Sequence, residues 1–258
     1  MEKKPPFLVI AGPCVIESKE MLFEVAAELK RICSHFNIEY IFKSSYKKAN
    51  RTSANSFTGI GDETALSYLA EVKEKFSIRV LTDIHSVEEA KLASQYVDIL
   101  QIPAFLCRQT ELLQAAAKTG KTVSIKKGQF LAPEDIGKAA EKVKNEGNNN
   151  IWLTERGTFF GYHNLVVDFR SFIIMKEFGY PVIYDATHSV QLPSQGEVSS
   201  GQPQFIIPLA KAAAAVGIDG LFFETHPEPQ RAKSDAASQL PLNKAEEIIK
   251  QVLRIIDN

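Results

Sequence analysis

The chain lacks several features that mark whole classes of protein. Its 258 residues include only three cysteines, Cys14, Cys33 and Cys107, which are widely spaced and form no Cys-x-x-Cys pair. That usage is typical of a reducing compartment rather than of a disulfide-stabilised secreted protein. No apolar run approaches the roughly 20 residues that a membrane span requires, and the first residues lack the apolar core of a signal peptide. We therefore expect a cytoplasmic protein with no membrane partner.

An excess of charge of one sign is also missing. The 30 Lys and Arg residues nearly balance the 31 Asp and Glu residues, for a formal net charge of −1. Nothing in that balance predicts binding to nucleic acid. The first apolar run is not followed by Gly-x-Gly-x-x-Gly, and the chain has no Walker loop, His-Glu-x-x-His or Ser-His-Asp order. A doubly wound dinucleotide-binding sheet is therefore only the second choice of fold.

What the chain does contain is a regular alternation of short β-type runs with stretches of helical apolar spacing. The expected strands are 8–11, 40–42, 80–81, 99–102, 122–125, 151–153, 182–184 and 220–223. The expected helices are 21–32, 64–76, 87–93, 110–117, 136–143, 205–216 and 242–256. Eight such strands in about 250 residues predict an α/β protein, a single-domain (β/α)8 TIM barrel over residues 1–258.

Ionisable, thiol or amide side chains follow every expected strand. In such a barrel these positions meet at one face, which is where the active site lies. They are Cys14, Lys43, Asp83 with His85, Gln101, Lys126 with Lys127, Glu155 with Arg156, Asp185 with His188, and Glu224 with His226. One polar residue after a strand is commonplace, whereas the convergence of all eight predicts a site. The alternation of Val123 and Ile125 places Lys126 inward and leaves Lys127 for a surface ion pair.

The candidate residues fall into two chemical groups. The cationic group consists of Lys43, Lys48, Arg51, Lys126 and Arg156. It suits a substrate with several negative charges, because Arg grips phosphate or carboxylate with two donors and Lys supplies a point charge. The second group offers a thiol, an imidazole and two carboxylates, from Cys14, His188, Glu224 and Asp235. Those donors suit a divalent transition metal such as Zn²⁺, Fe²⁺ or Mn²⁺.

Simpler interpretations stay open for single members of these groups. Taken alone, Cys14 is more often a buried apolar thiol, and His188 is more often a hydrogen-bonded loop histidine. The basic stretch 42–53 taken alone is more often a solvated surface loop. Its position after the second expected strand, facing Lys126 and Arg156, is what favours a binding role.

Ten short motifs occur in order along the chain and together resemble one enzyme family. They are Ile10-Ala-Gly-Pro-Cys14, Phe42-Lys-Ser-Ser45, Lys48-Ala-Asn-Arg-Thr-Ser53, Leu81-Thr-Asp-Ile-His85, Gln101-Ile-Pro-Ala-Phe105, Lys126-Lys-Gly-Gln-Phe130, Glu155-Arg-Gly157, 161–168, Asp185-Ala-Thr-His188 and Glu224-Thr-His-Pro-Glu228. In combination, over residues 7–242, they resemble the 3-deoxy-D-manno-octulosonate 8-phosphate synthases. The resemblance implies a homotetrameric barrel transferase of lipopolysaccharide synthesis. Its substrates would be phosphoenolpyruvate, D-arabinose 5-phosphate and water, and it would release phosphate.

The resemblance also implies a role for each matching residue. Those implied to bind phosphoenolpyruvate are Lys43, Ser45, Lys48, Gln101, Lys126 and Arg156. Those implied to bind the pentose phosphate are Asn50, Arg51, Ser200 and Arg108, the last from a neighbouring subunit. Asp83 is a further expected substrate-binding residue, and the expected catalytic residues are Lys48, His188 and Asp235. Because metal-independent members have Asn at the position of Cys14, the metal-dependent branch is implied, with the ligands Cys14, His188, Glu224 and Asp235.

Two alternatives of function remain. The sister enzyme 3-deoxy-7-phosphoheptulosonate synthase uses erythrose 4-phosphate with the same chemistry, but it typically has Lys-Pro-Arg-Thr-Ser, one residue shorter than 48–53 here. A non-catalytic barrel that only binds anions would not need a thiol, an imidazole and two carboxylates on one face. One departure from the family is Ser200-Gly-Gln-Pro-Gln204, because many members have a basic residue shortly after this glycine.

Overall fold

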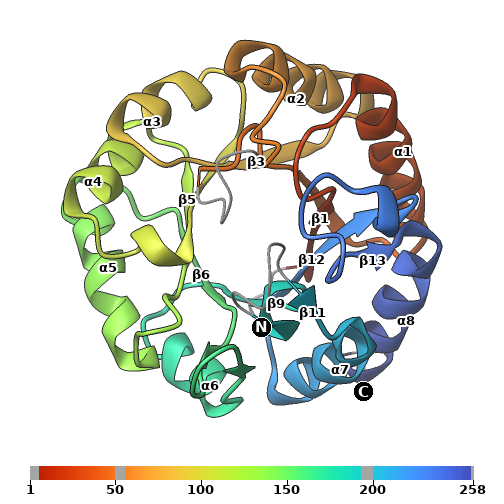
Figure 1. Cartoon of the computed structure of the whole chain (residues 1–258). Coiled ribbons are helices and arrows are strands. Elements are labelled where there is room, and N and C mark those ends of the chain that lie inside the picture. The colour runs from red at the N-terminus through yellow and green to blue at the C-terminus, as the bar shows by residue number, and fades with distance from the viewer. Residues whose placement is uncertain (1–5, 50–55, 193–199, 257–258) are drawn as a thin grey trace.

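The structure, a computed structural model, describes residues 6–49, 56–192 and 200–256 and contains a closed barrel of parallel strands (Figure 1). The barrel strands are β1 (Leu8–Gly12), β2 (Glu39–Lys43), β3 (Arg79–Asp83), β4 (Ile99–Ile102), β5 (Thr122–Lys126), β6 (Ile151–Glu155), β9 (Val182–Asp185) and β12 (Gly220–His226). They pair in that order, and β1 also pairs with β12, so the ring is closed. The predicted TIM barrel is confirmed, and the open doubly wound sheet is excluded.

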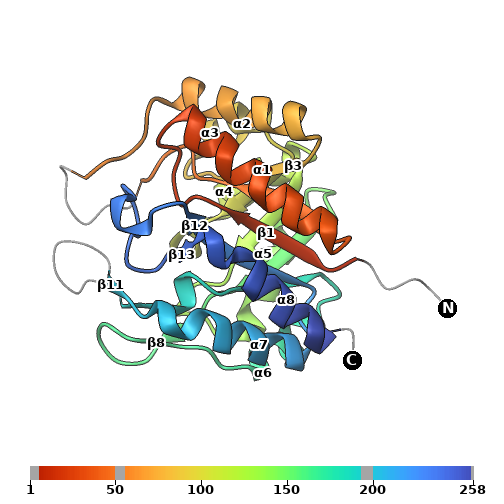
Figure 2. The same ribbon diagram turned by 90° about the vertical axis from the view of Figure 1, so that its right-hand side faces the viewer.

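Helices surround this ring on the outside (Figures 1 and 2). They are α1 (Lys19–His35), α2 (Asp62–Phe76), α3 (Val87–Ala93), α4 (Thr110–Lys118), α5 (Ile136–Lys144), α6 (Arg170–Lys176), α7 (Ile206–Val216) and α8 (Ala245–Ile256). The sequence prediction missed α6, because this helix has only seven residues and its apolar side chains run consecutively from Phe172 to Met175. No helix in the described ranges is long and apolar enough to cross a membrane.

Short elements decorate the loops that follow the strands. The small strands are β7 (Thr158–Phe159), β8 (Leu165–Val166), β10 (Gln191–Leu192), β11 (Ser200–Gly201) and β13 (Leu240–Pro241). The 3-10 helices are η1 (Ala104–Leu106), η2 (Pro133–Asp135), η3 (His188–Val190), η4 (Pro203–Phe205), η5 (Pro229–Arg231) and η6 (Leu242–Lys244). β7 pairs with β8 and β10 pairs with β11, both antiparallel. Figure 2 shows β8 and β11 at one end of the barrel and the C-terminal end of α8 at the other.

Two layers of side chains fill the inside of the barrel. The apolar layer consists of Leu8, Ile10, Ile41, Leu81, Ile99, Trp152, Ile183 and Phe222. Side chains alternate along a strand, so the residue two positions further on faces the same way. The polar layer above it is buried and consists of Lys43, Asp83, Gln101, Lys126, Arg156, Asp185 and Glu224. On five of the eight strands the sequence thus places an apolar residue two positions before a polar residue, and both face the inside of the barrel.

β1 contributes no side chain to the polar layer, because its last residue is Gly12. A Cβ atom on Gly12 would lie 2.1 Å from the carbonyl oxygen of Lys43. Only glycine therefore lets the ends of β1 and β2 approach this closely. Cys14 and Lys43 are brought together as a result, and Lys43 Nζ lies 3.4 Å from the carbonyl oxygen of Cys14.

Candidate active site

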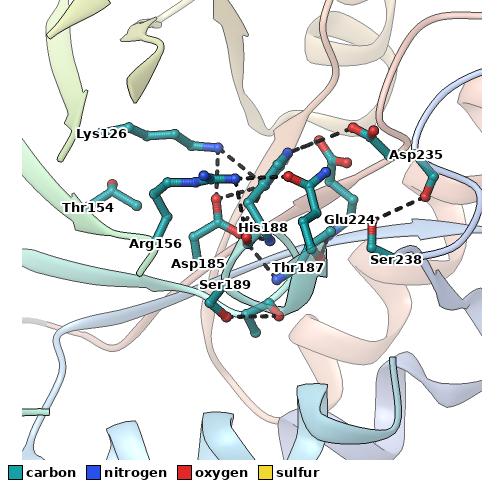
Figure 3. Close-up of polar contacts among 12 residues, drawn as sticks. Lys126, Thr154, Arg156, Asp185, Thr187, His188, Ser189, Glu224, Asp235 and Ser238 are labelled. Atoms are coloured by element: carbon teal, nitrogen blue, oxygen red, sulfur yellow. Dashed lines mark hydrogen bonds and ion pairs between the residues drawn. The ribbon is translucent and has the colours of Figure 1, made fainter. Parts of the chain in front are cut away.

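Lys126 ends β5 inside the barrel, among polar groups supplied by β9. Its Nζ atom lies 2.8 Å from Asp185 Oδ2 and 3.4 Å from His188 Nδ1, as Figure 3 shows. His188 Nδ1 is itself 2.8 Å from Asp185 Oδ2, and the backbone N–H of His188 donates to Asp185 Oδ1 at 2.9 Å. Asp185 therefore orients both the ammonium group and the imidazole.

Asp185 is fully buried and stays ionised because of its neighbours. Burial by itself would raise its pKa, but the charges of His188 and Lys126 outweigh that effect and hold the pKa well below its usual range. Sequence reasoning noted Asp185 at a strand end without giving it a role. The signal that was available is its spacing of two residues from Ile183, which faces the barrel interior.

Arg156 follows β6 and points into the same space from the side of Lys126 (Figure 3). Its Nη2 atom donates to the carbonyl oxygen of His188 at 3.1 Å and to Gln191 Oε1 at 2.9 Å. Among the described residues it forms no ion pair with a carboxylate, and burial lowers its pKa. A buried guanidinium that is bonded only to neutral acceptors is suited to an incoming anion.

On the opposite side of the barrel, Lys43 connects β2 with two carboxylates. Its Nζ atom lies 2.6 Å from Glu224 Oε1 and 3.7 Å from Asp83 Oδ2. Ser45 accepts hydrogen bonds from Lys43 Nζ at 3.2 Å and from Lys48 Nζ at 3.0 Å, and its hydroxyl donates to Asp83 Oδ2. The structure thus gathers several of the predicted substrate-binding residues around one hydroxyl group.

Asp83 also connects this cluster to β4, since Gln101 Nε2 donates to Asp83 Oδ1 at 2.5 Å. Burial would raise the pKa of Asp83, but Lys43 and Lys48 outweigh burial and hold it well below the usual range. Burial would likewise lower the pKa of Lys48, yet the negative charges of Glu224, Asp83 and Asp235 raise it. Both cations and the carboxylate are therefore charged in this pocket.

The residues expected to bind a metal also meet at this end of the barrel. Donor atoms of Cys14, Glu224 and Asp235 all lie within 4.8 Å of one another. His188 Nε2 lies 3.7 Å from Glu224 Oε1 and 4.0 Å from Asp235 Oδ2 (Figure 3). Glu224 Oε2 is buried without a hydrogen-bond partner among the described residues. A thiol, an imidazole and two carboxylates with a vacant carboxylate oxygen fit a divalent transition metal.

The thiol of Cys14 is held in place by residues that sequence reasoning did not single out. Its Sγ atom donates to Ser234 Oγ at 3.0 Å and lies 3.1 Å from Asp235 Oδ2. Gln239 Oε1 accepts from the backbone N–H of Cys14 at 3.3 Å, and Gln239 Nε2 donates to the carbonyl oxygen of Ser234 at 2.8 Å. Burial, followed by the charges of Asp235 and Glu224, raises the pKa of Cys14, so the thiol keeps its proton in the protein alone.

Of the four residues expected to bind the pentose phosphate, only two lie in the part of the chain that the structure describes. Asn50 and Arg51 lie outside the described residues. Ser200 lies in β11 opposite Leu192. Arg108 is exposed beyond β4 and lines a separate cavity of about 390 Å³ together with Lys138 and Lys142. Arg108 therefore lies away from the polar layer of its own chain, and its expected role on a neighbouring subunit stays a prediction.

The expectation that Lys127 forms a surface ion pair is wrong. Lys127 has an exposed fraction of 0% and lies 3.5 Å from Glu155 Oε2, which is also buried. Strand alternation correctly places Lys127 outside the barrel wall. It gives no information on what covers the residue there, and the loop 128–131 and β7 bury it completely.

Comparison with known proteins identifies the group to which this architecture belongs. Residues 2–256 match the family model described as the DAHP synthetase I family. A 2-dehydro-3-deoxyphosphooctonate aldolase of Trichlorobacter lovleyi is 55% identical over 246 residues, which is 95% of this chain and 90% of that protein. A protein of the same name from Koribacter versatilis is 53% identical over 255 residues, 97% of this chain and 91% of that protein. A third protein of this name, from Fusobacterium nucleatum, is 51% identical over 253 residues, which is 98% of this chain and 91% of that protein.

These relatives bear on the alternatives left by the sequence. Their name describes an eight-carbon 3-deoxy sugar acid phosphate, which is the kind of product that the sequence resemblance implies. That agreement confirms the resemblance and does not favour the seven-carbon alternative. With nearly its whole length matched, the chain belongs to the DAHP synthetase I family.

Proposed function

We propose that this chain condenses phosphoenolpyruvate with D-arabinose 5-phosphate and water to give 3-deoxy-D-manno-octulosonate 8-phosphate and phosphate. The product would supply a sugar of lipopolysaccharide. The observation that carries the proposal is the polar layer, in which buried cations and metal-type donors lie together at one end of the barrel interior. Relatives named 2-dehydro-3-deoxyphosphooctonate aldolase, at 51% to 55% identity over nearly the full chain, support the same reading.

Phosphoenolpyruvate would bind between the two cationic sides of the polar layer. Lys126 and Arg156 would hold its phosphate and Lys43 its carboxylate side, with Ser45, Lys48, Asp83 and Gln101 nearby. Lys126 and Lys43 are each balanced by an internal carboxylate, Asp185 and Glu224 respectively. At these two lysines the substrate would therefore replace existing partners, whereas Arg156, bonded to neutral acceptors, would receive the anion directly.

The same charges suit the reaction itself. As C3 of phosphoenolpyruvate attacks the aldehyde, negative charge develops on the sugar oxygen and positive character develops at C2. Lys48 stays protonated and would stabilise the developing oxyanion. Water would then add at C2, and the tetrahedral intermediate would expel phosphate, whose departure Lys126 and Arg156 would assist electrostatically.

We further propose the metal-dependent form of this chemistry. Because Asp185 binds Nδ1 of His188, the Nε2 atom faces Glu224 and Asp235 and is available as a ligand. A divalent metal, Zn²⁺, Fe²⁺ or Mn²⁺, would be held by Cys14, His188, Glu224 and Asp235 and would supply Lewis acidity to an oxygen of water or substrate. His188 and Asp235 would act catalytically through that role, and Asp235 is placed for it by a backbone φ of 49°.

The pentose phosphate would bind to Asn50, Arg51 and Ser200 of one chain and to Arg108 of a neighbour, which requires an oligomer. Support comes from the surface next to Arg108. Exposed aromatic side chains occupy the loops after β4, β5 and β6, namely Phe105, Phe130, Phe159, Phe160 and Tyr162. Several exposed aromatic side chains on the loops of three neighbouring strands are typical of a subunit interface. We propose a homotetramer, which sedimentation of the purified protein would test.

The decisive experiment measures phosphate release from phosphoenolpyruvate with each aldose phosphate and identifies the product by mass. We expect kcat/KM to be at least about 100-fold higher with arabinose 5-phosphate than with erythrose 4-phosphate, because a site built for a hydroxyl rejects the shorter analogue. The reverse preference would identify a 3-deoxy-7-phosphoheptulosonate synthase. Phosphoenolpyruvate binding without turnover of either aldose would identify an anion-binding barrel.

A further inference from the structure

We propose that the buried ion pair between Lys127 and Glu155 is a positioning device that sets the two phosphoenolpyruvate-binding cations Lys126 and Arg156. We call this pair the Lys127–Glu155 clamp. The inference rests on the proposed function, because that function assigns Lys126 and Arg156 to phosphoenolpyruvate. It concerns residues on the outer side of the barrel wall, which have no access to the substrate.

The two residues of the clamp are chain neighbours of the two cations. Lys127 follows Lys126 at the end of β5, and Glu155 precedes Arg156 at the end of β6. Lys126 is paired with Thr154 in the sheet, and the backbone N–H of Lys127 donates to the carbonyl oxygen of Thr154 at 2.8 Å. The clamp therefore continues the contact between β5 and β6 past the last pair of barrel residues.

The ammonium group of Lys127 binds together the segments that leave these strands. It donates to the carbonyl oxygens of Gly128 at 3.3 Å and Leu131 at 3.1 Å, and to Thr158 Oγ1 at 3.1 Å. Gly128 and Leu131 belong to the loop after β5, and Thr158 belongs to β7. A single buried cation thus fixes the course of the chain directly after Lys126.

The carboxylate of Glu155 performs the matching task on the other strand. Its Oε1 atom accepts from the backbone N–H of Gly157 at 2.5 Å, which closes a turn around Arg156. Gly157 has a φ of 90°, a conformation that favours glycine and makes this turn specific. The Oε2 atom lies 3.5 Å from Lys127 Nζ and has no hydrogen-bond partner in the described chain. Arg156 is therefore held between two residues that the clamp anchors.

Stability alone does not account for this arrangement. Both side chains are at most 1% exposed, and a buried ion pair is often no more stabilising than two well-packed apolar side chains. Hydrogen bonds connect the two side chains of the clamp to the chain segments that directly follow Lys126 and Arg156, namely 128–131 and 157–158. Because small displacements of binding groups are costly for catalysis, fixing these two positions is a sufficient reason for the pair.

The experiment compares four variants: Lys127→Met, Glu155→Leu, the double variant that combines them, and Glu155→Gln. Each single apolar variant leaves an unpaired buried charge, so we expect a lower unfolding midpoint and phosphoenolpyruvate binding that is weaker by about 10-fold to 100-fold. The double variant should regain the unfolding midpoint but not the affinity, measured by calorimetry and by KM. Glu155→Gln keeps an acceptor for Gly157 and should restore most of the affinity lost in Glu155→Leu. The KM for arabinose 5-phosphate should be unchanged throughout.

Val143→Ala provides the matched control, since Val143 is a fully buried apolar residue on α5. Its side chain cannot form a hydrogen bond to the ends of β5 and β6, which carry Lys126 and Arg156. This variant should lower the unfolding midpoint without changing phosphoenolpyruvate affinity.

The inference is overturned if the double variant regains affinity together with stability, or if both substrates' KM values rise in parallel. Calorimetry separates the two proposals: wild type that binds phosphoenolpyruvate but turns over no aldose refutes the proposed function only. Wild type that does not bind phosphoenolpyruvate refutes both.

Discussion

On β2, β3, β4, β9 and β12 the apolar layer and the polar layer of the barrel lie two residues apart, yet they differ in polarity and charge. Ile41, Leu81 and Ile183 belong to one apolar cluster, whereas Lys43 forms a buried ion pair with Asp83, and Lys126 forms another with Asp185. Phe222 forms the boundary, since Lys126 Nζ and Lys43 Nζ lie 4.3 Å and 5.5 Å from the centre of its ring. Stability is concentrated in one layer, and chemistry is concentrated in the next.

The difference teaches how charged groups can be kept buried in an exact arrangement. Each ionised side chain in the polar layer loses hydration, and its partners offset that loss only while their geometry is held. The tightly packed apolar layer beneath has low compressibility and so keeps the geometry of the polar layer fixed. Four predictions test this division, in order of decreasing effect.

Chelation of divalent metal should have the largest effect and should act on the polar layer alone. We expect activity to fall by about 10³-fold, because Lewis acidity contributes several kcal/mol to the stabilisation of a transition state. Addition of Mn²⁺, Fe²⁺ or Zn²⁺ should restore activity in the phosphate-release assay. Full activity of the chelated enzyme would contradict the metal-dependent proposal. Full activity of Cys14→Asn after chelation would show that the thiol can be dispensed with.

Ile99→Ala should damage the apolar layer and leave the chemistry intact. Ile99 is fully buried inside the barrel, so truncation should lower the free energy of unfolding by about 2–5 kcal/mol. Chemical denaturation measures the loss. Values of kcat and KM, taken where the protein is still folded, should match those of the wild type. A selective loss of kcat would show that the two layers are not separable.

Arg156→Lys should have the opposite signature. Lysine keeps the charge but lacks the planar pair of donors, so the KM for phosphoenolpyruvate should rise by about 10-fold to 100-fold. The free energy of unfolding should change little, since the hydrogen bonds of Arg156 to the described part of the chain go only to the carbonyl oxygen of His188 and to Gln191. An unchanged KM would remove Arg156 from the phosphoenolpyruvate site.

The combined variant Ser124→Ala with Thr154→Val should have the smallest effect. These two hydroxyls contact each other at 3.4 Å on β5 and β6, below Lys126 and Arg156. Replacing both partners of a buried hydrogen bond by apolar groups is nearly neutral, so we expect a change of less than about 1 kcal/mol in the free energy of unfolding. A large loss of stability or of activity would mean that the polar layer extends one step deeper on these strands.

Much of the fold and part of the site could be predicted from sequence. All eight barrel strands were expected, because short apolar runs alternate with stretches of helical spacing. The grouping of Lys43, Lys126 and Arg156 followed from the barrel geometry, and the structure buries all three in the polar layer. The substrate and catalytic roles of the site residues stay predictions, and Asn50 and Arg51 lie outside the described chain.

What escaped prediction depends on contacts between distant parts of the chain. Gln239 holds Cys14 across 225 residues, and no local pattern marks such a pair. The burial of Lys127 depends on the loop and strand that cover it, whereas alternation reports only the side of the sheet on which it lies. α6 was missed because its apolar residues are consecutive and give no helical spacing.

Gly12 sets a limit for anyone who wishes to redesign this barrel. At the other strands, the specificity of the cavity can be altered by exchanging one inward-facing side chain for another. At Gly12 in β1 no exchange is open, because even a methyl group would collide with the main chain of β2. New substrates would therefore have to be accommodated by substitutions on the remaining strands. The distance between the ends of β1 and β2 at Gly12 would stay the same.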